Sequence, residues 1–171
     1  MSGDASLLPS NKGKYMQNGK ILVKDYPCGS GKTSSMISSL SLDKKYLIVV
    51  PLLSEVERII DESDVPFHQP NSDKNSQHRT KYESLETLLL EGKNIVTTHQ
   101  LYSAIVSLAR EGLLSDYHII IDEVHERDKD IDFLLLLSRK FLTSNSPGCK
   151  IILMSATLNP EKLCSYYSWP L

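Results

Sequence analysis

The sequence predicts an α/β fold, a three-layer sandwich in which helices cover both faces of a mainly parallel sheet. Short apolar runs rich in Ile and Val recur along the chain. Their continuous apolar character, without polar alternation, is typical of strands that are buried on both faces. Helix-forming segments fill the gaps, so that strand and helix alternate about five times. This order favours βαβ units with right-handed crossovers.

The expected elements follow from these runs and from the residues that bound them. Strands are predicted over residues 20–25, 46–51, 94–98, 117–122 and 150–155. Helices are predicted over residues 32–40, 54–62, 99–112 and 130–142, with an amphipathic segment over 81–92 and a last short helix from Asn159 and Pro160. Ser54 is expected to cap the second helix, and Gly112 to end the helix that carries Arg110 in its last turn.

The expected domain organisation is a short leader followed by one domain. Residues 1–18 are rich in Ser, Gly, Asn and Lys without a sustained period, so we expect a flexible leader there. Residues 19–171 are expected to form a single domain with its own core. Within this domain, residues 63–80 carry two prolines and many polar side chains, and we expect a surface loop.

The composition is that of an ordinary globular domain. Hydrophobic residues make up 40% of the 171 residues and charged residues 23%, and the net charge is -2. This charge neither requires nor excludes a nucleic-acid partner. The three cysteines form no C-x-x-C pair, and no apolar run suits a signal peptide or a membrane span. We therefore expect an intracellular protein without a membrane partner.

A glycine-rich segment follows the first predicted strand. It is YPCGSGKT, residues 26–33, and it matches the phosphate-loop pattern G-x-x-x-x-G-K-[ST] except that Tyr26 replaces the first glycine. Such a loop presents backbone N–H groups to phosphate oxygens. The residues expected to bind nucleotide are Gly29, Ser30, Gly31, Lys32 and Thr33. Lys32 would reach the β- and γ-phosphates and the Thr33 hydroxyl would bind Mg²⁺; the alternative is a glycine turn beside a surface lysine.

Two adjacent carboxylates end the strand predicted over 117–122. Asp122 and Glu123 would therefore lie at the carboxyl edge of the sheet, where α/β proteins bind ligands. Asp122 is expected to hold Mg²⁺, directly or through water, and Glu123 to orient or deprotonate the water that attacks the γ-phosphate. The alternative is that Asp122 and Glu123 only cap a helix N-terminus. The GKT segment upstream argues against this alternative.

The segment Ser155-Ala156-Thr157 closes another apolar strand. Small hydroxyl side chains at a strand end transmit hydrogen bonds between a nucleotide site and the structure above it, although Ser and Thr also cap helices. We expect Ser155 and Thr157 to border the nucleotide site. GKT, DE and SAT thus stand in order, each at the end of a predicted strand.

These segments resemble a known family. GSGKT, DEVH and SAT look like motifs I, II and III of superfamily 2 helicases of the DExH type. Residues 118–141 and 150–167 are especially similar to DEAH-box RNA helicases, and the middle of the chain is similar to phage-type DEAD/DEAH helicases. The resemblance implies a P-loop NTPase domain of the RecA-like type, the first of two motor domains, with ATP and Mg²⁺ as cofactors.

The resemblance also implies roles for particular residues. Lys32 and Glu123 would take the catalytic roles described above, and His125 would couple ATP hydrolysis to the rest of the motor through Ser155 and Thr157. Residues 48–59 would be motif Ia and residues 95–103 motif Ib, which face the nucleic-acid backbone in the family. Single-stranded RNA or DNA is the partner that this implies.

A second motor lobe is expected as a further partner, in cis or in trans. Superfamily 2 helicases close ATP between two RecA-like lobes, and the second lobe supplies arginine fingers worth roughly 10³ to 10⁵ in rate in related systems. We therefore expect the chain to bind ATP·Mg²⁺ and to hydrolyse it weakly by itself. A non-translocating nucleotide-binding module and a small-molecule P-loop kinase are the alternatives; Glu123 argues against the first, and DEVH and SAT against the second.

Overall fold

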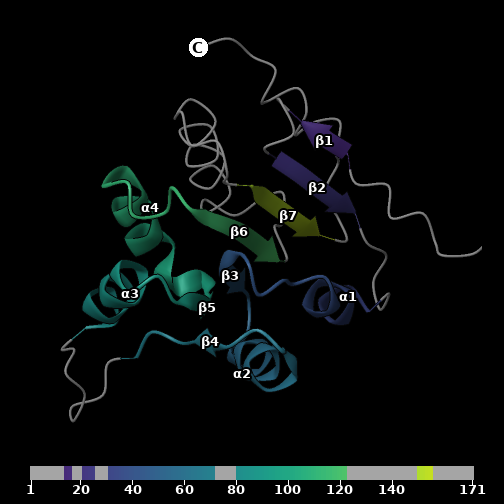
Figure 1. The fold of residues 1–171 in the computed structure, drawn as a ribbon, viewed down its shortest axis with the longest axis horizontal. Helices are drawn as coiled ribbons and strands as arrows, with labels where there is room; N and C mark the ends of the chain where they lie inside the picture. Colours follow the sequence, from purple (N-terminus) through teal and green to yellow (C-terminus); the bar gives the residue numbers. More distant parts are fainter. Residues whose placement is uncertain (1–13, 17–20, 26–30, 72–79, 123–149, 156–171) are drawn as a thin grey trace, which may run out of the picture.

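A single sheet of seven strands organises the part of the chain that the computed structural model describes, residues 14–16, 21–25, 31–71, 80–122 and 150–155. The strands are β1 (Lys14–Met16), β2 (Ile21–Asp25), β3 (Lys45–Val50), β4 (Phe67–His68), β5 (Asn94–Thr98), β6 (Tyr117–Asp122) and β7 (Ile151–Ser155). Their order is β1-β2-β7-β6-β3-β5-β4. All neighbours pair in parallel except β1, which is antiparallel to β2 (Figure 1). The prediction of a mainly parallel α/β sheet is confirmed.

Helices cover both faces of this sheet. They are α1 (Lys32–Ser38), α2 (Leu53–Glu62), α3 (Lys81–Leu90), the 3₁₀ turn η1 (His99–Leu101) and α4 (Tyr102–Arg110). Residues of α1 and α2 pack with one set of sheet side chains, and residues of α3 and α4 pack with the other (Figure 1). The expected three layers are therefore present.

The central strand β3 shows why its apolar run is unbroken. Leu47 and Val49 pack with α3 and α4, whereas Ile48 and Val50 pack with α1 and α2. All four are at most 1% exposed, because β3 lies between β5 and β6 and both faces of the sheet are covered. Alternate residues of such a strand point to opposite faces, so both sets must be apolar.

The start of α2 differs from the prediction. The helix begins at Leu53 rather than at Ser54, and its N-cap, Leu52, supplies no side-chain hydrogen bond. The nearby Leu52 backbone N–H favours the ionised form of Glu55 and lowers its pKa, as expected for a glutamate three residues after the N-cap. The prediction that Ser54 caps this helix was wrong, because the helix begins at Leu53 and Ser54 already lies within its first turn.

Two strands were missed. The two-residue strand β4 lies within the loop expected over 63–80, where Phe67 is buried and pairs in register with Asn94 of β5. The antiparallel strand β1 lies within the leader expected over 1–18. Strands this short carry no readable period, and only pairing with a neighbour defines them. The helices expected over 130–142 and from Asn159 lie outside the described residues.

The helix expected over 99–112 is built in two parts. It starts with the 3₁₀ turn η1 and continues as α4, and Gly112 follows its end with φ of 84° while Arg110 lies in the last turn, as predicted. No helix in the described part of the chain combines the length and apolarity that a membrane crossing requires.

Candidate functional site

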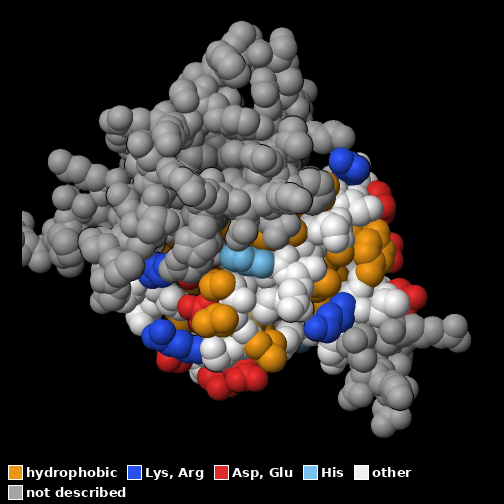
Figure 2. All heavy atoms as spheres, turned by 180° about the vertical axis from the view of Figure 1, so that it is seen from behind, with side chains coloured by type: hydrophobic (Ala, Val, Ile, Leu, Met, Phe, Trp, Pro, Cys, Tyr) orange, Lys and Arg blue, Asp and Glu red, His pale blue; other side chains and the backbone are white. Residues whose placement is uncertain are grey.

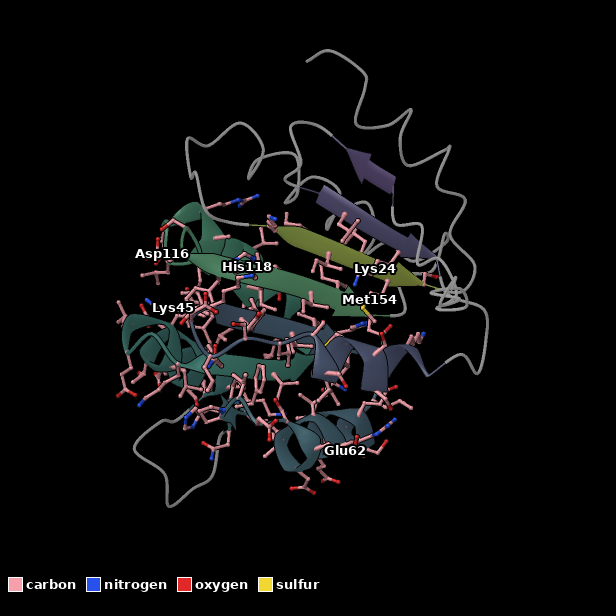
Figure 3. All side chains as sticks on the ribbon, turned by 45° about the vertical axis from the view of Figure 1, so that its right-hand side comes forward. Lys24, Lys45, Glu62, Asp116, His118 and Met154 are labelled. Carbon is pink, nitrogen blue, oxygen red and sulfur yellow. The ribbon has the colours of Figure 1, made fainter. Side chains whose placement is uncertain are left out.

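The parallel strands end together at one edge of the sheet, here called the carboxyl edge. In register, Val50 lies beside Thr98 and Val49 beside Ile121, so that β5, β3 and β6 finish at one level. Asp122 at the end of β6 pairs with Met154, next to Ser155 at the end of β7. Figure 3 shows Lys24 and Met154 toward this edge, and Lys45, Asp116 and His118 at the opposite end of the strands.

A buried ion pair joins the first helix to the end of β6. The Lys32 Nζ lies 3.3 Å from Asp122 Oδ1, and the two side chains are 16% and 0% exposed. Charges that are buried to this extent require a partner of opposite sign, because desolvation of a lone charge costs several kcal/mol. The structure therefore brings together the lysine and the aspartate that the sequence analysis selected as phosphate and Mg²⁺ ligands.

Gly31 is the part of the predicted phosphate loop that the structure describes directly before α1. Gly31 adopts φ of 71° and ψ of 30°, a left-handed conformation that costs other residues roughly 1–2 kcal/mol. A Cβ added at Gly31 would meet no atom of the described residues within 4 Å. Thr33, two residues on, is buried with 6% exposure. The nucleotide-binding roles that the motif gives to Gly31 and Thr33 stay predictions.

The Thr33 hydroxyl and the Asp122 carboxylate are hard oxygen donors of the kind that Mg²⁺ prefers. Mg²⁺ keeps several of its waters and needs only one or two protein ligands beside the phosphates of a nucleotide, so this pair fits its chemistry. Over the described ranges, no group of three or more His, Cys, Asp or Glu is arranged to hold a metal without a nucleotide.

A second carboxyl group, Glu55, lies near Asp122 and was missed as a site residue. Burial is the main cause that raises the Glu55 pKa above its ordinary value, and the nearby Asp122 charge raises it further; the Leu52 N–H, Lys32 and Arg58 oppose this. Glu55 Oε2 is buried and has no hydrogen-bond partner among the described residues. In the sequence, Glu55 stands out only as a glutamate in the first turn of the helix after β3, and a glutamate is common there as part of a helix cap.

His99 contacts the aspartate from another direction. Its Nε2 lies 2.9 Å from the Asp122 carbonyl oxygen, and its ring stacks on that of Tyr102 with centroids 4.9 Å apart and an interplanar angle of 26°. The sequence analysis placed His99 within motif Ib and assigned it no role. Only the fold shows that it reaches the end of β6.

Other predicted site residues lie outside the described residues. They are Gly29, Ser30, Glu123, His125 and Thr157. Their assigned roles stay predictions. Ser155 is described and is fully buried at the end of β7, beside the strand that carries Asp122.

Comparison with known proteins agrees with this geometry. The sequence model of the DEAD/DEAH box helicase family matches residues 13–165. "Probable ATP-dependent RNA helicase spindle-E" of Drosophila ananassae is 52% identical over 63 residues, which are 36% of this chain and 4% of that protein. "ATP-dependent RNA helicase TDRD9" of Mus musculus is 43% identical over 88 residues, 50% of this chain and 6% of that protein. The matched segments are thus a small part of these relatives.

A solved structure, that of the DUF1998 helicase MrfA bound to DNA, aligns with 86% of this chain and 23% of its own chain, at 22% identity and a TM-score of 0.46.

The family match spans most of the present chain, from the strand β1 to beyond β7, and includes the segment that carries Lys32 and the strand that ends at Asp122. The chain therefore belongs to the DEAD/DEAH box helicase family and carries the ATP-binding α/β domain of that family.

Proposed function

We propose that this chain is the first RecA-like motor lobe of an ATP-dependent nucleic-acid helicase, which binds ATP·Mg²⁺ and hydrolyses it slowly unless a second lobe is supplied. The observation that carries the proposal is the buried pair of Lys32 and Asp122 at the carboxyl edge, 3.3 Å apart. In P-loop NTPases the loop lysine contacts the β- and γ-phosphates and an aspartate helps to hold Mg²⁺. Here Lys32 follows β2 and Asp122 ends β6, with β7 between these two strands.

In this proposal Lys32 changes partner when nucleotide binds. Without nucleotide its ammonium neutralises the buried Asp122 carboxylate. With nucleotide, Lys32 contacts the β- and γ-phosphates, while Asp122 and Thr33 offer oxygen ligands to Mg²⁺. Bound Mg²⁺ would neutralise part of the phosphate charge. The buried pair thus keeps both side chains in place for the ligand.

The hydrolytic step would depend on residues after Asp122. Glu123 would orient the attacking water, and His125 would pass the state of the nucleotide to Ser155 and Thr157. Arginine fingers from a second lobe would supply the remaining stabilisation, roughly 10³ to 10⁵ in rate. We therefore infer that the chain alone turns over slowly.

Single-stranded nucleic acid is the proposed partner. Motifs Ia and Ib leave the carboxyl edge after β3 and β5, and Leu52 and Leu53 are 59% and 53% exposed there. The two relatives found by sequence, spindle-E and TDRD9, are named as ATP-dependent RNA helicases, which favours RNA over DNA. Figure 2 shows Lys and Arg side chains scattered among Asp and Glu on the described part of one face, so no continuous basic strip marks a path there. An intracellular location belongs to the same proposal.

Single-turnover ATP hydrolysis by the chain, with and without single-stranded RNA or DNA, tests the proposal. Stimulation by nucleic acid, lost in Lys32→Ala, is the expected result. Nucleotide binding without turnover under any condition would instead indicate a non-translocating nucleotide-binding module, and transfer to a small acceptor would indicate a kinase. Rapid multiple turnover by the chain alone would contradict the need for a second lobe.

A further inference from the structure

His99 makes a contact that sheet pairing does not require. The strand β5, which ends just before His99, pairs with β3 and β4, and β6 pairs with β3 and β7. β3 therefore separates β5 from β6. The His99 side chain crosses the end of β3 and reaches the carbonyl oxygen of Asp122, 2.9 Å from its Nε2. This bond links two strands that do not touch through their backbones.

The protonation of the ring follows from the partner. A carbonyl oxygen only accepts hydrogen bonds, so Nε2 of His99 must carry the proton and donate it. The ring is half-buried and stacked on Tyr102, the first residue of α4, which limits its rotation. The imidazole is thus held as a directed donor toward Asp122.

We propose that His99 is a positioning residue for ATP hydrolysis, which acts by fixing the peptide plane between Asp122 and Glu123. The inference rests on the proposed ATPase function. The peptide group is planar, so a bond to the Asp122 carbonyl also sets the direction in which the chain continues to Glu123. The Asp122 side chain itself is held by burial and, before nucleotide binds, by Lys32.

Because His99 contacts the peptide group of Asp122 and not its side chain, we can predict which step depends on His99. Nucleotide binding uses Lys32, Thr33 and the Asp122 side chain, which other contacts hold. Hydrolysis needs the next residue, Glu123, in its productive direction, and a misplacement of about 1 Å costs on the order of 10²-fold in rate. Loss of the His99 donor should therefore slow hydrolysis and spare binding.

The contact also gives a physical link between two motifs. His99 opens η1, directly after β5, within the segment proposed to face nucleic acid. A shift of η1 on nucleic-acid binding would move the donor, and with it the peptide that precedes Glu123. The same residue would thereby contribute to stimulation of hydrolysis by single-stranded RNA.

Three variants of the full chain separate these effects. His99→Phe keeps an aromatic ring for Tyr102 and removes the N–H donor. His99→Gln restores an N–H donor of similar reach. His118→Phe is the matched control, because His118 is also a half-buried histidine in ring contact with a tyrosine, Tyr46, but lies at the start of β6, far along the strand from Asp122.

The measurement is single-turnover hydrolysis against ATP·Mg²⁺ concentration, with single-stranded RNA present. We expect His99→Phe to lower the limiting rate about tenfold or more while the half-saturating concentration stays within about twofold. His99→Gln should recover a large part of the rate, and His118→Phe should match the wild type. In NMR spectra of the wild type, the His99 Nε2–H proton should exchange slowly with water, and its signal should be lost in His99→Phe.

The outcomes distinguish this inference from the proposed function. A wild-type chain that binds and hydrolyses ATP, with an equal rate in His99→Phe, overturns the role of His99 and leaves the proposed function standing. An equal loss of rate and of nucleotide affinity in His99→Phe, without rescue by His99→Gln, also overturns it, since that pattern means a general structural defect. A wild-type chain that shows no nucleotide binding or hydrolysis overturns both.

Discussion

The buried polar groups at the two edges of the sheet differ in charge and in their hydrogen bonds. At the amino edge, where the parallel strands begin, the Tyr117 hydroxyl donates to the Lys93 carbonyl at 2.9 Å, and the Tyr46 N–H donates to Asn94 Oδ1 at 2.9 Å. At the carboxyl edge, Asp122 is fully buried against Lys32, and Glu55 Oε2 is buried with no partner among the described residues. These polar groups at the amino edge are neutral and hydrogen-bonded, whereas those at the carboxyl edge are carboxyl groups beside a lysine.

This contrast indicates that the amino edge contributes to stability and the carboxyl edge to ligand binding. A buried neutral hydrogen bond stabilises a fold by about 1 kcal/mol, whereas buried charges carry a desolvation cost that apolar residues would avoid. A domain selected for stability alone has no reason to place two carboxyl groups near one lysine. The amino edge therefore holds the sheet together, and the carboxyl edge is shaped for a charged ligand.

The largest expected effect compares one lysine from each edge. Lys32→Ala should weaken ATP·Mg²⁺ binding by about 100-fold, because it removes two charge-assisted contacts to phosphate. Lys45→Ala removes an exposed amino-edge lysine that lies 6.0 Å from the Tyr117 ring centroid, and affinity should stay within about twofold. Titration with a fluorescent ATP analogue measures both, and similar losses in the two variants would erase the distinction between the edges.

The next comparison uses Asp122, the last residue of β6, and Asp116, the residue just before β6. Asp122→Asn should lower ATP affinity about tenfold in the presence of Mg²⁺ and much less with Mg²⁺ chelated, because the substitution removes a metal ligand. Asp116→Asn alters an exposed residue just before β6 and should leave affinity unchanged. Calorimetric titration with and without EDTA provides the test. An Asp122→Asn variant with unchanged Mg²⁺ dependence would contradict the metal role.

At the amino edge the expected effect is on stability. Tyr117→Phe should lower Tm by about 2–4 °C, because two carbonyls, those of Leu89 and Lys93, lose their shared donor. Burial raises the pKa of Tyr117 to about 12, so its hydroxyl stays protonated and the difference should be constant from pH 7 to 9. Thermal melts followed by circular dichroism measure it. Reduced nucleotide affinity in this variant would argue against a purely structural amino edge.

The smallest expected effect tests the cost of buried charge at the carboxyl edge. Glu55→Gln should raise Tm by about 1–2 °C at pH 7, because Gln keeps an oxygen for the Leu52 N–H and removes the charge near Asp122. Glu57→Gln, exposed on the same helix, is the control.

The sign of the pH dependence follows from the direction of the shift. Burial raises the Glu55 pKa above its ordinary value of 4.5, so the ionised group destabilises the fold above the raised pKa, and this cost disappears once pH falls below 4.5. The gain in Tm from Glu55→Gln should shrink to zero over that range. A gain that is the same at pH 4 and pH 7 would show that charge is not its cause.

The sequence predicted the central sheet well and its margins poorly. The bounds of β5 and β6 agree with the prediction. β6 has a run of three Ile residues that Asp122 closes, and β5 has a short apolar centre, Ile95 and Val96, between polar residues. The strand β4 has two residues and no period of its own, so only its pairing with β5 defines it. Ser54 failed as a cap because the helix begins at Leu53, so Ser54 lies within its first turn.

The motif residues Lys32, Thr33 and Asp122 were selected from sequence because their spacing within a strand–loop–helix order is local information, and parallel strands necessarily end at one edge. Glu55 and His99 were not, because their contacts depend on how α2 lies beside α1 and on β3 lying between β5 and β6. Strand order is set by the packing of all layers together. That Glu55 and His99 lie close to Asp122 was therefore decided by the tertiary structure alone.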